Sequence, residues 1–249
     1  MTPSEKAVLD ELELFRREAN DCTTCLYAYL TIHAVGGQMS RVHRQLNEHA
    51  LFWNTTLRAL QTALLIALGR VFDSSSRHNI TILVRKMEAN RTVFSRKALR
   101  IRKQAIFADA AGLQEYMRDV VAPHAGDFRR IARLVELRRA TYHRVYKALR
   151  DKVFAHLVLT DSKHVQKLFS QTNIRELERL TTFLGRLHDA YLETFHNGRR
   201  LAVRPSRYAV GRIIRSPKGA RAVKSVHEEI IAHTRSVLLS LGTDNAGMP

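Results

Sequence analysis

The chain has 249 residues, of which 45% are hydrophobic, and this composition excludes an intrinsically disordered protein because enough apolar side chain is present to bury a core. Two cysteines are too few for a disulfide scaffold, and the longest apolar run, Ala63 to Leu68, is far shorter than the roughly 20 residues that a bilayer requires. The 41 Lys and Arg residues against 23 Asp and Glu residues give a formal charge of +18, which indicates a polyanionic partner.

Helical periodicity covers the first third of the chain. Ser4 is predicted to cap a helix that runs to about residue 32 and ends at Gly36-Gly37. A second long helix is predicted over residues 40–72, and its second half is apolar on nearly all sides, which is typical of the centre of a bundle. A turn at residues 73–76 then precedes a short helix capped by Asn79.

The middle of the chain continues the helical pattern. Residues 91–103 form a cationic stretch without an acid, and a helix over residues 113–121 is expected to end before Pro123. A long basic helix is predicted over residues 128–159, and Asn173 is predicted to cap a further helix that ends at Asn197-Gly198. Because no segment alternates convincingly as a strand, the sequence predicts an all-α protein built as an antiparallel helical bundle.

The composition changes after Gly198. Residues 199–221 contain eight basic residues and no acid, and a last helix is predicted over residues 223–241. We therefore predict a helical bundle domain over residues 1–198 and a basic C-terminal arm that ends in a helix over residues 199–249. The arm can be a flexible tail or a segment that gains affinity by releasing counterions from a phosphate backbone, and the two interpretations are compatible.

Nucleic acid is the leading candidate for the polyanionic partner, since arginine, which forms bidentate contacts with phosphate, dominates the basic residues. An acidic protein, a membrane surface or a merely solvated positive face are the alternatives. The N-terminus, residues 1–6, leads into acidic residues, whereas a signal peptide has a basic start and an apolar run. We expect a soluble cytoplasmic protein without a membrane partner.

Familiar metal and nucleotide motifs are absent from the sequence. Cys22 and Cys25 form half of a metal site without a second pair, and His227 and His233 stand six residues apart where a zinc-protease motif requires four. No phosphate-cradling glycine loop, nucleophile elbow or paired-carboxylate pattern is present. We therefore expect neither a metal nor a cofactor.

Arginine and histidine remain as candidates for chemistry. RNA is cleaved without a metal when one group takes the 2′-hydroxyl proton, another protonates the leaving oxygen and a cation stabilises the phosphate. Histidine titrates in the range of the first two roles, and arginine suits the third. Five Arg/His pairs have a spacing of five or six residues, namely Arg44/His49, Arg118/His124, Arg138/His143, Arg150/His156 and Arg221/His227.

Context selects Arg150 and His156 among these pairs. Asp151, a polar residue, directly follows Arg150, and the segment lies in a helical pattern without a proline, between Leu149 and Leu157. An ideal α-helix would place the two side chains some 120° apart, so one helix does not make a compact site.

This segment resembles the active-site signature of the HEPN superfamily, in particular its AbiU-type abortive-infection branch. The resemblance also covers Phe52-Trp53, the apolar run to residues 70–73, and residues 80–83, and it extends over roughly residues 5–198. It implies a metal-independent ribonuclease with 2′,3′-cyclic phosphate products, acting as a toxin or phage-defence effector. It further implies a homodimer that brings two Arg/His pairs together. Asp151 is expected to orient Arg150 or His156 by hydrogen bonding, and a surface pair with a neighbouring base on the helix is the alternative.

Further basic residues are predicted to bind RNA. Arg144 and Lys147 precede the signature on the same helix, and the other candidates lie in the cationic stretch and at the start of the arm. These other candidates are Arg96, Lys97, Arg100, Arg199 and Arg200. A solvated positive face or an acidic antitoxin or defence partner are the alternatives, and a non-catalytic nucleic-acid-binding protein is the rival function.

Overall fold

The first helix, α1 (Pro3–Gln38), is the centre of the fold in the computed structural model, which describes all residues except 108, 156–161, 217–223 and 242–249. Two predictions about its ends are wrong. Thr2 caps it through a capping box with Glu5, so the cap is not Ser4. The helix also continues through Gly36, where a Cβ would lie 2.7 Å from Leu46 Cδ1, so the glycine accommodates the next helix.

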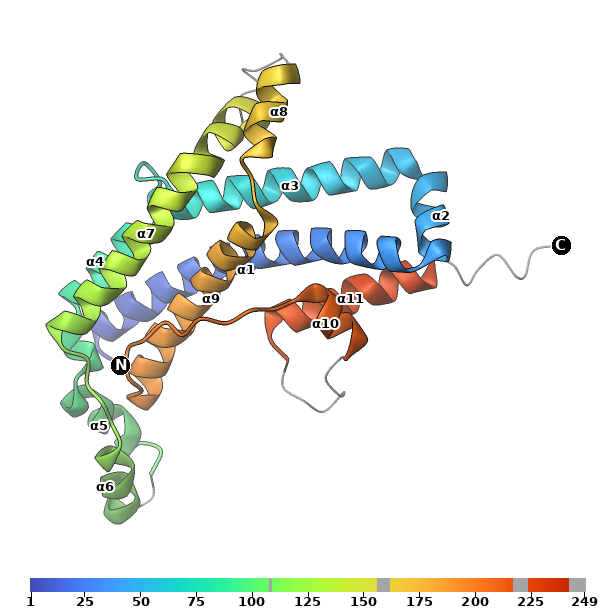
Figure 1. Cartoon of the computed structure of the whole chain (residues 1–249). Helices are drawn as coiled ribbons and strands as arrows, with labels where there is room; N and C mark the ends of the chain where they lie inside the picture. The colour runs from blue at the N-terminus through green and yellow to red at the C-terminus, as the bar shows by residue number, and fades with distance from the viewer. Residues whose placement is uncertain (108, 156–161, 217–223, 242–249) are drawn as a thin grey trace.

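The predicted helix over residues 40–72 is two helices. The short α2 (Ser40–Glu48) and the long α3 (Ala50–Phe72) are separated at His49, whose φ of −110° and ψ of 39° interrupt the helical backbone. Because α2 turns the chain back, α3 runs antiparallel to α1 and lies beside it (Figure 1).

The next segment builds the far end of the molecule. Asn79 caps α4 (Ile80–Ala89) as predicted, by accepting from the backbone N–H groups of residues 81 and 82. The 3₁₀ helix η1 (Arg91–Phe94) leads into α5 (Arg96–Gln104), followed by α6 (Ala110–Arg118). The last two helices enclose a small separate core of four residues, Leu99, Leu113, Met117 and Val120.

The second half of the bundle carries the candidate signature. The helix α7 (Ala125–Leu149) continues as a π-helix, η2 (Arg150–Ala155), and α8 (Ser162–Ser170) follows. The helix α9 (Ile174–Asn197) is capped by Asn173 and ends at Gly198, as the sequence predicts. Gly198 has a φ of 60°, which favours glycine, and a Cβ there would lie 2.7 Å from Val120 Cγ1.

An extended segment over residues 199–209 leads from α9 to α10 (Val210–Arg215) and then to α11 (Val226–Ser240). The helix α11 packs along α1, with Ile231 and Leu238 buried, and α3 and α9 contact other faces of α1 (Figure 1). The described residues form helices and connecting segments without a strand, which confirms the all-α fold class. The core is rich in aromatic side chains that are fully buried, among them Tyr27, Phe72, Tyr142, Tyr146 and Tyr191.

Candidate active site

The signature begins where α7 changes from an α-helix to a π-helix. Tyr146 and Leu149 are buried in the core, and the widened turn of η2 starts at the next residue, Arg150. A π turn inside a longer helix is rare and frequently lies at a functional site. The ideal-helix angle between Arg150 and His156 therefore does not apply, because the intervening backbone is not α-helical.

Arg150 reaches from η2 to the C-terminal end of α3. Its guanidinium forms an ion pair with Asp73, the residue that follows α3, and its Nε donates to Asp151 Oδ1 at 2.7 Å. The aliphatic part of the side chain crosses Gly69, where a Cβ would lie 2.7 Å from Arg150 Cδ. The glycine thus opens a slot between α3 and η2 that holds Arg150 with 18% of its side chain exposed.

Lys147 completes a cluster of two cations and two carboxylates, which we call the Arg150 cluster: Asp73, Lys147, Arg150 and Asp151. Lys147 Nζ lies 2.6 Å from Asp151 Oδ2 and 4.0 Å from Asp73 Oδ1. The two positive and two negative charges balance. A phosphate that binds Arg150 must therefore displace a carboxylate or approach an edge of the guanidinium that remains exposed.

The charges of the Arg150 cluster stabilise each other. Burial disfavours the charged form of Arg150, but hydrogen bonds to Asp151 and Asp73 outweigh it and raise the pKa of this side chain. Burial likewise acts against the Asp151 carboxylate, yet hydrogen bonds from Lys147 and Arg150 lower its pKa. Tyr142 lies beneath the cluster, fully buried with a hydroxyl that has no hydrogen-bond partner, and burial raises its pKa far above the ordinary value.

Of the three predicted catalytic residues, the structure brings together two, Arg150 and Asp151. His156, the predicted acid–base group, lies outside the described residues. Gly69 and Asp73 were not predicted as site residues, because in the sequence they belong to an apolar run and a turn. The sequence nevertheless carries a signal for Asp73, because this residue directly follows the most apolar helix. A carboxylate that is buried at the end of a helix requires a cation as its partner.

The two predicted RNA-binding residues on α7 differ in availability. Arg144 is 73% exposed and its Nη2 lies 3.6 Å from Glu176 Oε1, a long contact that leaves the guanidinium accessible. Lys147 is engaged in the Arg150 cluster. Arg144 therefore fits a backbone contact beside the cluster, whereas Lys147 contributes chiefly to holding Asp151.

The cationic stretch is partly used inside the protein. Arg96 donates to the carbonyl oxygens of Val120 and Met117, and so satisfies acceptors at the end of α6. Arg102, a half-buried member of the same stretch, donates to Glu5 Oε1 at 2.6 Å and joins α5 to α1. Lys97 and Arg100 are exposed, and they remain predicted RNA contacts.

Arg199 and Arg200 lie at the start of the extended segment and are exposed. They line a hollow of about 510 Å³ together with Arg186 and Arg204, beside the C-terminal end of α9. None of the described side chains of η2 lines this hollow. The predicted site residues therefore fall into separate regions and do not form one patch.

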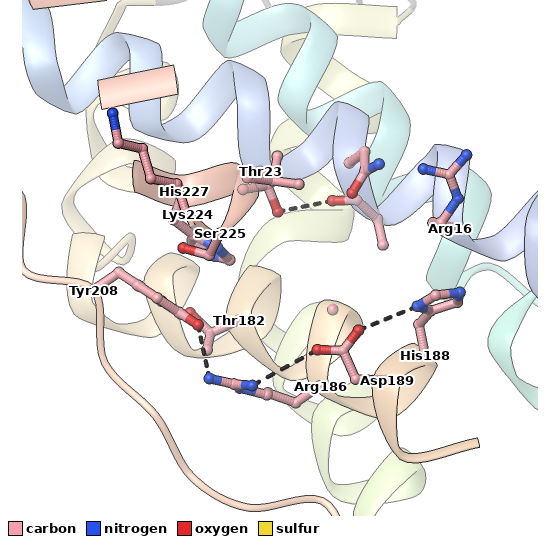
Figure 2. A pocket seen from close by; sticks show the side chains of 14 residues that line it. Arg16, Thr23, Thr182, Arg186, His188, Asp189, Tyr208, Lys224, Ser225 and His227 are labelled. Atoms are coloured by element: carbon pink, nitrogen blue, oxygen red, sulfur yellow. Dashed lines mark hydrogen bonds and ion pairs between the residues drawn. The ribbon is translucent and has the colours of Figure 1, made fainter. Parts of the chain in front are cut away.

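A further hollow of about 260 Å³ lies where α11 begins (Figure 2). In it Arg186 Nη2 donates to the Tyr208 hydroxyl at 2.7 Å, and His227 stacks on the Tyr208 ring with centroids 3.9 Å apart. His227 is buried and its Nε2 has no partner, and burial lowers its pKa to about 4. These contacts hold the extended segment between α9 and α11.

The described residues contain no group of three or more His, Cys, Asp or Glu side chains placed to hold a metal ion. Cys22 is fully buried, and burial raises the pKa of its thiol well above the ordinary value. None of the helices within the described ranges is both long and apolar enough to cross a bilayer.

Comparison with known proteins identifies one family. The model of the family HEPN_AbiU2, described as AbiU2, matches residues 5–207. Curated proteins give no match. Solved structures likewise give none.

Proposed function

The chain belongs to the AbiU2 family of HEPN proteins, and from that premise we propose that it is a metal-independent endoribonuclease that acts as a toxin or abortive-infection effector. The observation that carries the proposal is the Arg150–Asp151 pair in a π turn that leads directly to His156 in the sequence. An RNA target implies action in the cytoplasm.

The proposed chemistry divides between Arg150 and His156. A histidine takes the proton of the 2′-hydroxyl, the freed oxygen attacks the adjacent phosphorus, and a second protonated group delivers a proton to the 5′-oxygen that leaves. The guanidinium of Arg150 stabilises the negative charge that develops on the phosphoryl oxygens. The products are a 2′,3′-cyclic phosphate and a 5′-hydroxyl. Asp73 and Asp151 position Arg150 for this role.

Two histidines are needed for this division of labour, and each chain supplies one from the signature. We propose that a homodimer brings two signatures together across a two-fold axis. The start of α3 supports association, because two apolar side chains there, Leu51 and Phe52, are 85% and 63% exposed. Light scattering is expected to give twice the mass of the chain, and Phe52→Glu is expected to shift the protein toward the monomer.

The test is incubation of the purified protein with mixed RNA in EDTA. We expect cleavage to 2′,3′-cyclic ends, and decreases of at least a hundredfold in rate for Arg150→Ala and for His156→Ala. The matched control is Arg44→Ala with His49→Ala, an exposed pair of the same residue types at a similar spacing along α2 and its C-terminal cap, and it is expected to keep full activity.

Intact RNA in all reactions, with and without the activator of a defence system, would contradict the ribonuclease proposal. Cleavage that persists in the Arg150 and His156 variants would instead locate the activity elsewhere. Growth arrest on expression that is relieved by His156→Ala is expected in cells.

A specific observation favours a second function, which is non-catalytic binding of nucleic acid. Each nitrogen of the Arg150 guanidinium already contacts Asp73 or Asp151, which is the arrangement of a structural arginine. Salt-sensitive RNA binding without cleavage would support this function. Co-purification of an acidic protein, with neither RNA binding nor cleavage, would support an antitoxin or defence-complex partner.

A further inference from the structure

Arginines gather between α7, α9 and the extended segment over residues 199–209. Three hollows of about 290, 130 and 510 Å³ lie next to one another, and the middle one shares lining residues with each of the other two. We call this region the arginine groove and define it by the arginines that have no ion-pair partner among the described residues, which are Arg138, Arg175, Arg179, Arg204 and Arg207. The paired Arg186 lies in its floor.

Positive charge dominates the first two hollows. Four arginines and one acid, Glu178, line the hollow of about 290 Å³. The smaller hollow beside it is lined by Arg138, Arg179, Arg186 and Arg204 without an acid. The third hollow, which Arg199 and Arg200 line, contains more acidic residues than the other two. The strongest positive potential therefore lies around Arg138 and Arg179.

The arginines of the groove have no described carboxylate within ion-pair distance, unlike most other buried cations of the protein. Within the described part of the chain, none of these five side chains has a hydrogen bond or an ion pair. Arg138 is half-buried, its Nε is buried without a partner, and its guanidinium lies 5.5 Å from the Phe183 ring centroid. Such uncompensated donors in a depression are a binding site for anionic oxygen atoms.

Electrostatics within the groove point the same way. Burial, and then the nearby charge of Arg179, lower the pKa of Arg138, while the charge of Glu176 acts against that shift. Burial also raises the pKa of Glu178, even though Arg207 and Arg175 act against that shift. Glu178 is thus the one acid that faces the four arginines of this hollow.

The wall of the groove is fixed by specific contacts. Arg186 Nε donates to Ser206 Oγ at 2.9 Å, and its Nη2 donates to Tyr208, whose ring stacks on His227 (Figure 2). Leu201 is buried in the main core. The extended segment is thus attached at several points, which places Arg204 and Arg207 opposite the arginines of α7 and α9 without a further ordering cost on binding.

We propose that the arginine groove binds the phosphates of a single-stranded RNA at a distance from the Arg150 cluster, as an additional contact of the proposed ribonuclease, on whose function this inference rests. The occupant is a polymer because the arginines continue through connected hollows, whereas a single small anion needs only one of them. Arg138 and Arg150 lie on one continuous helical rod, twelve residues or about 18 Å apart along its axis. Twelve residues at about 100° each also leave the two side chains some 120° apart around the rod, so a strand that contacts both regions must cross its surface.

The test measures binding of a fluorescent 20-nucleotide single-stranded RNA by anisotropy, in EDTA and in a His156→Ala background that prevents cleavage. Arg179→Glu combined with Arg207→Glu reverses two exposed charges of the groove. We expect Kd to rise at least tenfold. The slope of log Kobs against log salt is expected to fall by roughly 1.4, which is about 0.7 for each phosphate that the variant no longer neutralises.

The matched control is Arg41→Glu combined with Arg85→Glu, which makes the same change of charge at exposed arginines on α2 and α4, away from the groove. It is expected to raise Kd less than threefold, and both double variants are expected to unfold at the parent temperature. Equal weakening by the two double variants would overturn the inference, because the charge would then act without a site.

Two further arms separate the groove from other outcomes. Tighter binding of ATP or inorganic triphosphate than of RNA, abolished by the groove substitutions, would assign the groove to a small polyphosphate and overturn the RNA proposal. The protein with His156 intact could also bind RNA through the groove without ever cleaving it. That result would refute the ribonuclease function but would support the groove as an RNA-binding site. If RNA is cleaved and the groove substitutions do not change KM, the groove inference would be refuted and the ribonuclease function would remain.

Discussion

The Arg150 cluster and the arginine groove use the same side chain in opposite ways. At the cluster, Arg150 contacts two carboxylates, and each charge is matched by one of opposite sign. In the groove, Arg138 and Arg179 lie near each other and have no carboxylate partner within the described chain. The paired arginine holds elements of the fold in place, while the unpaired ones keep their donors available for a ligand. Counting basic residues therefore overstates the number that can meet RNA.

Asp73→Ala is expected to give the largest effect on stability. It leaves Arg150 in its slot with Asp151 alone, and we expect the free energy of unfolding to fall by about 3 kcal/mol, the low end for removal of one partner of a buried pair. Urea unfolding measures this change. Combining it with Arg150→Ala should cost about 1 to 2 kcal/mol less than the sum of the single changes.

Asp189→Ala provides the exposed counterpart of that experiment. Asp189 pairs with Arg186 at 3.7 Å on the surface, and its removal is expected to change the free energy of unfolding by less than about 0.5 kcal/mol. If Asp73→Ala were equally mild, the Arg150 cluster would not be the structural element that we describe.

Low pH is expected to destabilise the protein through His227, the residue that holds the wall of the arginine groove by stacking on Tyr208. The pKa of this histidine is lowered to about 4 by burial, so the unfolded chain takes up a proton first as the pH falls below 6.5. The stability that the neutral, buried His227 contributes is fully present above pH 6.5. Its loss between pH 7.5 and 5 lowers the free energy of unfolding by about 2 kcal/mol. In His227→Phe, which keeps the stacking on Tyr208, this part of the pH dependence should disappear from urea unfolding curves.

Gly69→Ala tests whether the slot between α3 and η2 holds Arg150, by a change on the α3 side of the slot. The added methyl group meets the side chain of Arg150, and we expect a decrease of about 1 to 2 kcal/mol in stability together with reduced RNA cleavage. In the Arg150→Ala background the same substitution should be neutral or stabilise by up to about 1 kcal/mol, because alanine favours a helix over glycine. A decrease of the same size in both backgrounds would show that Arg150 does not occupy the slot in solution.

Arg179→Gln is expected to give the smallest effect, with the opposite sign. Removing a cation that repels Arg138 should raise the free energy of unfolding by up to about 0.5 kcal/mol at low salt, and the gain should vanish at 1 M salt. Destabilisation at low salt would mean that Arg179 has a partner and would remove it from the set of available arginines.

Local signals in the sequence predicted the helices and several of their ends well. Asn79, Asn173 and Gly198 act through backbone groups within a few residues, so their roles follow from their neighbours alone. Gly36 misled the prediction because its reason is a distant side chain, Leu46. A local cause makes a helix end accessible to sequence analysis, although the equally local cap of α1 by Thr2 was missed.

The candidate site was predictable only in part for the same reason. Arg150 and Asp151 are adjacent in the sequence and were found together, but Asp73 reaches Arg150 from a helix far earlier in the chain. The π turn has no sequence signature that periodicity could detect. The members of the arginine groove come from three segments, and only packing reveals that Arg138 and Arg207 line one hollow.

The packing of α11 against α1 has a kinetic consequence. Ile32 and Val35 share a small core with Leu238, so this contact closes a loop of roughly 200 residues and is expected to form late in folding. Until it forms, α1 carries an uncovered apolar strip, which is the surface where a partly folded chain would aggregate or meet a chaperone. The wall of the arginine groove, which ends at Tyr208 against His227 of α11, is completed in that same late step.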